Sequence, residues 1–205
     1  NGGAGNNTLI GVAGDDLFTV VMGTSDDPTV QGGLGSDTLN LSFNRSSSFG
    51  IVLRDGSGSE LSFATAFADW ASALTGGYFT VGSSNDGRFS GFEFVNIDAS
   101  GNTYTYGGGD IWYMNGTRYI GQSTASNRFV ANWSAQTVGI NWTLGSEGEG
   151  ALANGVTVGN LEQLYVALGT GNDSIVGGSL ADYIDGGAGN DTINGGAGNN
   201  KLIGG

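Results

Sequence analysis

The residues best suited to chemistry in this chain are aspartates that recur at nine-residue intervals behind paired glycines. From Leu168 the chain reads LGTGNDSIV, GGSLADYID, GGAGNDTIN and GGAGNNKLI. Near the amino end, GGAGNNTLI from Gly2, GVAGDDLFT from Gly11 and GGLGSDTLN from Gly32 share the pattern G-G-x-G-x-D-x-U-x, where U is a large apolar residue. Aspartate carboxylates are hard oxygen donors of the kind that Ca²⁺ prefers. The spacing therefore predicts calcium chemistry.

The G-G-x-G-x-D half of each unit has the composition of a turn that can hold the ion. Glycine permits backbone angles that bring carbonyl oxygens inward, and two stacked turns can supply the six to eight oxygens that Ca²⁺ takes at about 2.3–2.6 Å. Solvated Asp-Gly turns are the simpler alternative, but four successive units from Leu168 keep one register, which favours metal-binding turns. We predict several calcium ions, with ligands from Asp16, Asp37, Asp173, Asp182, Asp191, Asp110, Gly33, Gly35, Gly171, Gly187 and Gly189.

Three positions qualify this expectation. Asn7 and Asn200 stand where the pattern has aspartate, so their turns are expected to bind calcium more weakly. Asp110 belongs to a degenerate unit and is the candidate for a calcium site that is open to a ligand.

The x-U-x half of each unit predicts a short strand whose apolar residue points into the molecule. Turns and short strands that alternate at this period are typical of a parallel β-roll with calcium in its turns. The expected fold is mainly all-β, a right-handed parallel β-roll or β-solenoid. The inward residues are expected to include Leu9, Leu39, Ile175, Ile184 and Ile193.

The repeats lie at the two ends of the chain, with a long segment between them. GGAGNNTLIG near the amino end almost duplicates GGAGNNKLIG near the carboxyl end, as expected for a roll that an insertion divides. Stacked repeats need neighbours for stability, so both ends are expected to join in one domain, 1–205. Within it we distinguish amino-terminal turns (1–40), a ligand-binding insertion (41–167) and carboxy-terminal turns (168–205). Because both ends lie within repeats, we expect the chain to be part of a longer protein.

The insertion contains segments that resemble further coils. FEFVNIDASG from Phe92 and NLEQLYVALGTG from Asn160 each combine an acidic residue, alternating apolar residues and a glycine turn, so the roll is expected to continue inside the insertion. Alternation over 128–133 and 138–144 predicts strands. Apolar residues at helical spacing in Ser59–Gly77 predict one short helix that packs on the sheet.

Composition excludes several classes of function. The chain has 41 glycines and a formal charge of −13, with no Cys and no His. The absence of Cys and His removes disulfides, soft-metal sites and the usual general base, so we expect no enzymatic activity. The charge disfavours nucleic acids and anionic membranes. No apolar run approaches the roughly 18 residues of a membrane span, so no membrane insertion is expected.

An aromatic and arginine cluster follows the degenerate unit of Asp110. It lies in IWYMNGTRYIG, residues 111–121, and in the strand after it. Aromatic residues and arginine are enriched at binding hot spots, and arginine pairs with carboxylates. Aromatic caps on a roll with solvated arginines are an equally good interpretation. The candidate ligand-binding residues are Trp112, Tyr113, Arg118, Tyr119, Arg128 and Trp133.

The motifs GGAGNDTIN and GTGNDSIV, split around an aromatic insert, resemble the RTX (repeats-in-toxin) ligand-binding regions of long adhesins of Gram-negative bacteria. The size and arrangement are similar to the peptide-binding domain of such adhesins. The resemblance covers residues 1–45 and 160–205. It implies an extracellular, cell-surface, monomeric module that serves cell adhesion and biofilm formation. Such a module captures the free carboxyl terminus of a partner protein or peptide through a calcium ion.

Other functions remain open at the level of the sequence. A calcium-dependent lectin would use the same ion with sugar hydroxyls and aromatic rings, so a glycan is a possible partner. A passive RTX segment for secretion and folding would leave the aromatic insert unexplained. An enzyme such as a polysaccharide lyase with appended repeats would have to use a base other than His. Ice binding is disfavoured because GTGND, at Gly169 to Asp173, occurs once.

Overall fold

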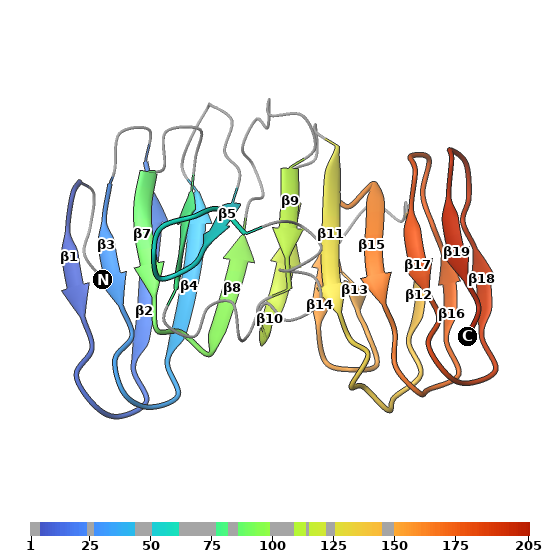
Figure 1. Ribbon diagram of the computed structural model, residues 1–205, viewed down its shortest axis with the longest axis horizontal. Helices are drawn as coiled ribbons and strands as arrows, with labels where there is room; N and C mark the ends of the chain where they lie inside the picture. Colours follow the sequence, from blue (N-terminus) through green and yellow to red (C-terminus); the bar gives the residue numbers. More distant parts are fainter. Residues whose placement is uncertain are drawn as a thin grey trace.

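The structure is a computed structural model in which every regular element of the described residues is a β-strand (Figure 1). It describes residues 5–23, 27–43, 51–61, 77–81, 86–98, 109–113, 115–121, 126–144 and 150–205, apart from the side chains of 51–53, 81, 86, 109, 110 and 112. Among these residues, no helix has the length and apolar character to cross a membrane. The expected helix at Ser59–Gly77 falls largely on residues 62–76, which lie outside the described residues.

Two sheets begin at the amino-terminal end of the row, and the second extends to two strands from residues 150–159. The first runs in spatial order through β1 (Thr8–Ile10), β3 (Thr29–Gln31), β7 (Asp86–Ser90), β6 (Tyr78–Val81) and β5 (Ile51–Arg54). The second runs through β13 (Gly150–Ala151), β14 (Thr157–Gly159), β10 (Asn115–Ile120), β8 (Phe94–Asp98), β4 (Thr38–Phe43) and β2 (Leu17–Met22).

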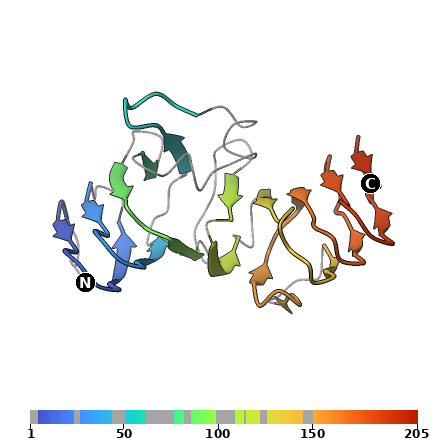
Figure 2. The ribbon, with the colours of Figure 1, turned by 60° about the horizontal axis from the view of Figure 1, so that its bottom comes forward.

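Two further sheets form the carboxy-terminal half. One runs through β19 (Lys201–Ile203), β17 (Tyr183–Asp185), β15 (Gln163–Ala167), β11 (Asn127–Asn132) and β9 (Gly109–Trp112). The other contains β12 (Asn141–Thr143), β16 (Ser174–Val176) and β18 (Thr192–Asn194). The strands follow one another in a long row, with the two chain ends at opposite ends of it (Figures 1 and 2).

Parallel pairing at a fixed sequence interval defines the coils of this row. In the carboxy-terminal repeats, equivalent residues such as Asn172 and Asn190 hydrogen-bond across 18 residues, which is two nonapeptide units. Successive units therefore fall alternately on the two sheets, β17–β19 and β16–β18. Near the amino end the interval between Asp15 and Ser36 is 21 residues. This all-β arrangement of parallel strands is consistent with an RTX-type β-roll.

The ladders continue through the segment expected to be an insertion. β4 pairs in parallel with β8, where Asn96 hydrogen-bonds to Asn40 across 56 residues. β8 pairs with β10, and β15 pairs with β17. The expected boundaries at 40 and 168 therefore do not coincide with breaks in strand pairing. The antiparallel pair β5–β6 lies between β4 and β7 in the sequence, and Figure 2 shows it to one side of the row.

The core lies between the sheets and is filled by alternate residues of each strand. In β4, Leu39, Leu41 and Phe43 are buried, whereas the residues between them are partly exposed. Leu39, Ile175 and Ile184 are fully buried, as the repeat pattern predicted. Leu9 and Ile193 are partly buried against the same core because each lies in an outer coil.

Candidate metal centre

The aspartates of the repeats lie directly before the strands and link neighbouring coils. One carboxylate oxygen of Asp37, Asp173, Asp182 and Asp191 accepts a backbone N–H from the coil beside it. Asp16 N donates to Asp37 Oδ1 at 2.9 Å, and Asp173 N donates to Asp191 Oδ1 at 2.9 Å. Leu164 N donates to Asp182 Oδ1 at 2.6 Å. These bonds align the turns of successive coils, so that carboxylates stack along the roll.

The second oxygen of three of these carboxylates is buried with no hydrogen-bond partner among the described residues: Oδ2 of Asp37, Asp173 and Asp191. Leaving a buried charged oxygen unsatisfied is costly, because water no longer solvates it. A cation bound beside it removes that cost. The orphaned oxygens therefore fit the predicted calcium sites. Asp182 differs, since its Oδ2 accepts the N–H of Gly178 at 3.0 Å.

The carboxylates of Asp37 and Asp191 lie over the glycine that begins their own turn. A Cβ built on Gly32 would lie 2.7 Å from Asp37 Oδ2, and one built on Gly186 would lie 2.8 Å from Asp191 Oδ2. Both distances are too short for a side chain at either glycine. Glycine at the first position therefore leaves the oxygens of Asp37 and Asp191 uncovered, whereas Leu168 holds this position in the turn of Asp173.

Backbone carbonyls of the preceding coil lie close to the other glycines of these turns. A Cβ on Gly33 would lie 2.8 Å from Gly11 O, and a Cβ on Gly189 would clash with Gly171 O. Gly35 and Gly189 have φ values of 142° and 141°, in the region that favours glycine. In the described part of the chain no three His, Cys, Asp or Glu side chains gather as a metal-ligand group. Calcium held here would therefore take carbonyl oxygens for many of its ligands, as the repeat pattern predicted.

The remaining predicted glycines fit the same geometry. A Cβ on Gly187 would clash with Gly169 O and lie 2.5 Å from Leu168 O. A Cβ on Gly171 would lie 2.5 Å from Gly139 N. Each glycine permits two coils to approach closely.

The electrostatics of the turns also favours a cation. Burial is the main cause that raises the pKa of Asp173 above its ordinary value of 3.8, and the negative charge of Asp191 raises it further. Burial likewise raises the pKa of Asp182. Both shifts mean that the charged form is disfavoured when no cation is present.

Two glutamates take the same position in the stack of carboxylates, although no nonapeptide motif surrounds them. Glu93 Oε2 accepts the N–H of Asp37 at 2.7 Å, and Glu162 Oε2 accepts the N–H of Asn127 at 2.7 Å. Both lie in the segments whose sequences resembled further coils. The acidic residue of each segment was visible in the sequence, but its role as the equivalent of the repeat aspartate was not assigned.

Asparagine at the aspartate position of a repeat makes the same hydrogen bond to the neighbouring coil. Asn200 Oδ1 accepts the N–H of Asp182 at 2.9 Å. The amide thus preserves the link between coils without the negative charge.

The aromatic part of the expected ligand-binding cluster is largely core, which corrects that expectation for two residues. Tyr119 is 0% exposed and Trp133 is 1% exposed. Their rings pack against Phe129 at centroid distances of 5.5 and 5.6 Å. The Tyr119 hydroxyl donates to Val95 O at 3.0 Å and accepts the N–H of Gly116 at 2.7 Å. Neither side chain is available to a ligand at the surface.

The other members of that cluster lie on two sheets. Tyr113 is half-buried against the core, and burial raises the pKa of its hydroxyl. Arg118, on β10, forms an ion pair with Asp98 on β8, with 2.5 Å between Nη1 and Oδ2. Asp110 and Trp112 lie on β9, where Asp110 is in register with Arg128 of β11. The structure therefore brings Asp110 close to Arg128 and places Arg118 on a different sheet.

Comparison with known proteins agrees with this geometry at the ends of the chain. The family model of the RTX calcium-binding nonapeptide repeat (4 copies) matches residues 1–19 and 168–202, less than half of the chain. Searches of curated proteins and of solved structures gave no match. The family match supports an RTX calcium-binding β-roll. Both ends of the chain thus carry RTX calcium-binding repeats, which indicate a calcium-binding module.

Proposed function

We propose that this chain is a calcium-dependent ligand-binding module of a bacterial surface adhesin, without catalytic activity. The observation that carries the proposal is the set of buried carboxylate oxygens of Asp37, Asp173 and Asp191, which have no hydrogen-bond partner in the described residues. Calcium at these turns would hold the coils together and give a rigid scaffold. RTX repeats are typical of secreted proteins, which supports an extracellular location.

Within this proposal, the ligand is the free carboxyl terminus of a partner protein or peptide, bound through one calcium ion. A terminal carboxylate is a hard oxygen donor, and its capture is a recurrent mode of peptide recognition. With a net charge of −13, the chain needs a local cation to attract it. The register of Asp110 with Arg128 supports this site, because calcium held at Asp110 and the guanidinium of Arg128 would both favour a carboxylate. Half-buried Tyr113 follows β9 and offers a ring for the preceding ligand residue.

The test is a comparison of one peptide in three forms. A library of peptides with random free carboxyl termini is screened on the calcium-loaded chain. The best peptide is then measured by calorimetry as the free acid, as the carboxy-terminal amide and as the amino-acetylated acid. The amide should bind at least about tenfold more weakly, since it lacks the charged oxygen donor. Acetylation should have little effect.

Variants test the position of the site. Arg128→Gln should weaken binding of the free acid. Arg88→Gln is the matched control, because Arg88 lies on β7 of another sheet, 3.8 Å over the Tyr78 ring. Equal affinity of acid and amide would exclude the carboxylate mechanism. The absence of binding on a glycan array in calcium would then favour a passive RTX segment.

A further inference from the structure

A polar hollow of about 320 Å³ lies on the sheet that contains β2, β4, β8 and β10. This sheet differs from the one that carries Asp110 and Arg128. The polar side chains around the hollow include Asn40, Ser42, Asn96, Asp98, Thr117 and Arg118. Its size falls at the lower end of the roughly 300–1,000 Å³ of small-molecule sites.

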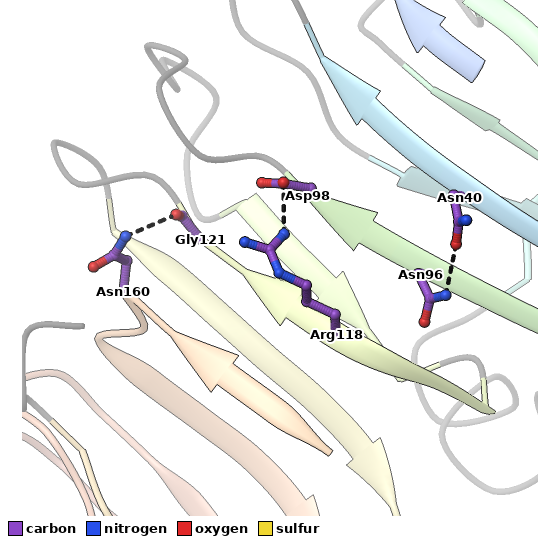
Figure 3. Close-up of polar contacts among 6 residues, drawn as sticks. All are labelled: Asn40, Asn96, Asp98, Arg118, Gly121 and Asn160. Atoms are coloured by element: carbon purple, nitrogen blue, oxygen red, sulfur yellow. Dashed lines mark hydrogen bonds and ion pairs between the residues drawn. The ribbon is translucent and has the colours of Figure 1, made fainter. Parts of the chain in front are cut away.

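Hydrogen bonds fix these side chains in place (Figure 3). Asn96 Nδ2 donates to Asn40 Oδ1 at 2.7 Å. Thr117 N donates to Asn96 Oδ1 at 2.5 Å. The ion pair between Arg118 and Asp98 crosses from β10 to β8 beside them. Because parallel strands hold these residues, the hollow is organised before any ligand arrives, which reduces the entropy lost on binding.

β8 adds an apolar platform to the same face. Val95 and Ile97 are buried, so Phe94, Asn96 and Asp98 alternate onto the outer face. Phe94 is 39% exposed. Residues two apart on a strand are separated by about 6.6 Å, so these three side chains present an aromatic ring, an amide and a carboxylate over about 13 Å.

The charge of the hollow points to a neutral ligand. The guanidinium of Arg118 and the carboxylate of Asp98 offset each other. The chain as a whole carries −13, which repels phosphates, sulfates and acidic sugars. Hydroxyl groups both donate and accept hydrogen bonds, so they match a surface that contains amides, hydroxyls, a carboxylate and a guanidinium.

We propose that this face binds a neutral oligosaccharide. One sugar ring packs its C–H face on Phe94, and hydroxyls of the same or the next ring hydrogen-bond to Asn96 and Asp98. The bond from a sugar hydroxyl to the Asp98 carboxylate is charge-assisted and therefore one of the stronger contacts. This site does not use calcium as a ligand to the sugar and is separate from the proposed carboxylate site.

The test uses the whole chain with saturating calcium and an array of neutral oligosaccharides, with di- and trisaccharides of glucose, galactose, mannose and N-acetylglucosamine. The best binder is titrated by calorimetry against Phe94→Ala, Asn96→Ala and Asp98→Asn. Each substitution should weaken binding at least tenfold. Gln31→Ala, an exposed polar residue on β3 of the other amino-terminal sheet, should leave the affinity unchanged.

Three results would overturn the proposal. These are no binding of any neutral sugar at millimolar concentration, binding of acidic sugars alone, and binding that none of the three β8 substitutions weakens. Circular dichroism and melting temperature in calcium check that each variant is folded. Asp98→Asn disturbs the ion pair with Arg118, whereas Phe94→Ala and Asn96→Ala keep it. The proposal can therefore be refuted even if Asp98→Asn is unstable.

Discussion

A single substitution, Asp191→Asn, can separate the hydrogen-bonding role of a repeat aspartate from its calcium-binding role. Asp191 Oδ1 accepts the N–H of Asp173 at 2.9 Å, whereas its Oδ2 is buried without a partner in the described residues. An asparagine can keep the first interaction and removes the charge. The chain already contains this arrangement, since Asn200 accepts the N–H of Asp182 at 2.9 Å. Asn200→Asp is therefore the matched reverse change.

The expected magnitude depends on calcium. In chelator, Asp191→Asn retains a hydrogen bond worth about 1 kcal/mol and removes the repulsion between two carboxylates. The free energy of unfolding should then stay within about 1 kcal/mol of the wild-type value or rise. In calcium at 100 times the dissociation constant, one bound ion contributes about 2.7 kcal/mol. Loss of that ion should lower the melting temperature by about 5–11 °C, at roughly 2–4 °C per kcal/mol for a domain of this size.

The assay is thermal unfolding of the wild type, both single variants and the double variant, each in chelator and in a calcium series. Asn200→Asp should show the opposite pattern, with lower stability in chelator and higher stability in calcium. If Asp191→Asn lost as much stability in chelator as in calcium, Asp191 would be a structural hydrogen-bond acceptor and the assignment of its orphaned oxygen to calcium would be wrong.

Three further predictions follow from the same contacts. Chelation of calcium should lower the melting temperature and loosen the fold. Magnesium should restore little of the lost stability, because it prefers octahedral geometry and retains water. Equal melting curves in calcium and in chelator would contradict this prediction. Gly189→Ala should cost at least about 2 kcal/mol of folding stability by denaturant unfolding, because its φ is 141° and a Cβ would clash with Gly171 O. Gly204→Ala is its control, since a Cβ there meets nothing within 4 Å. Equal losses of folding stability in the two variants would show that the close approach of Gly171 O does not require glycine at position 189. Tyr119→Phe should lower the free energy of unfolding by about 1–3 kcal/mol, since it leaves the carbonyl of Val95 and the N–H of Gly116 without their partner. It should not change ligand affinity. A changed affinity with unchanged stability would show that Tyr119 contacts the ligand.

The repeats could be predicted from sequence because their chemistry is local. Each unit contains its own turn glycines, its carboxylate and its inward apolar residue. The burial of Ile175 and Ile184 therefore follows from the nine-residue pattern alone. The coil length does not follow from it, since 18 residues separate equivalent positions near the carboxyl end and 21 near the amino end.

The central segment could not be predicted as well, because the phase of a strand decides which side chains point inward. β10 pairs with β8 with a register shift between Asn115 and Tyr119. Strict alternation is lost there, so that Tyr119 and Ile120 are both buried next to partly exposed Arg118. A cluster of aromatic residues and arginine in the sequence is compatible with either face. The sequence was therefore compatible with a binding surface but could not separate buried Tyr119 from partly exposed Arg118.

The persistence of the ladders through the central segment shows what each coil requires. A coil needs an inward apolar side chain and an acceptor for the backbone N–H at the turn of its neighbour. Glu93 and Glu162 provide that acceptor without the glycine motif, as Asp37 and Asp191 do within it. The glycines have a further role, because they let the backbone of the neighbouring coil approach the turn closely. We therefore expect calcium at the coils that carry the motif, whereas a coil can form without it. This chain therefore loses the motif over many residues and keeps its strand pairing, so the outer face of β8 is not bound to the residue types of the repeat.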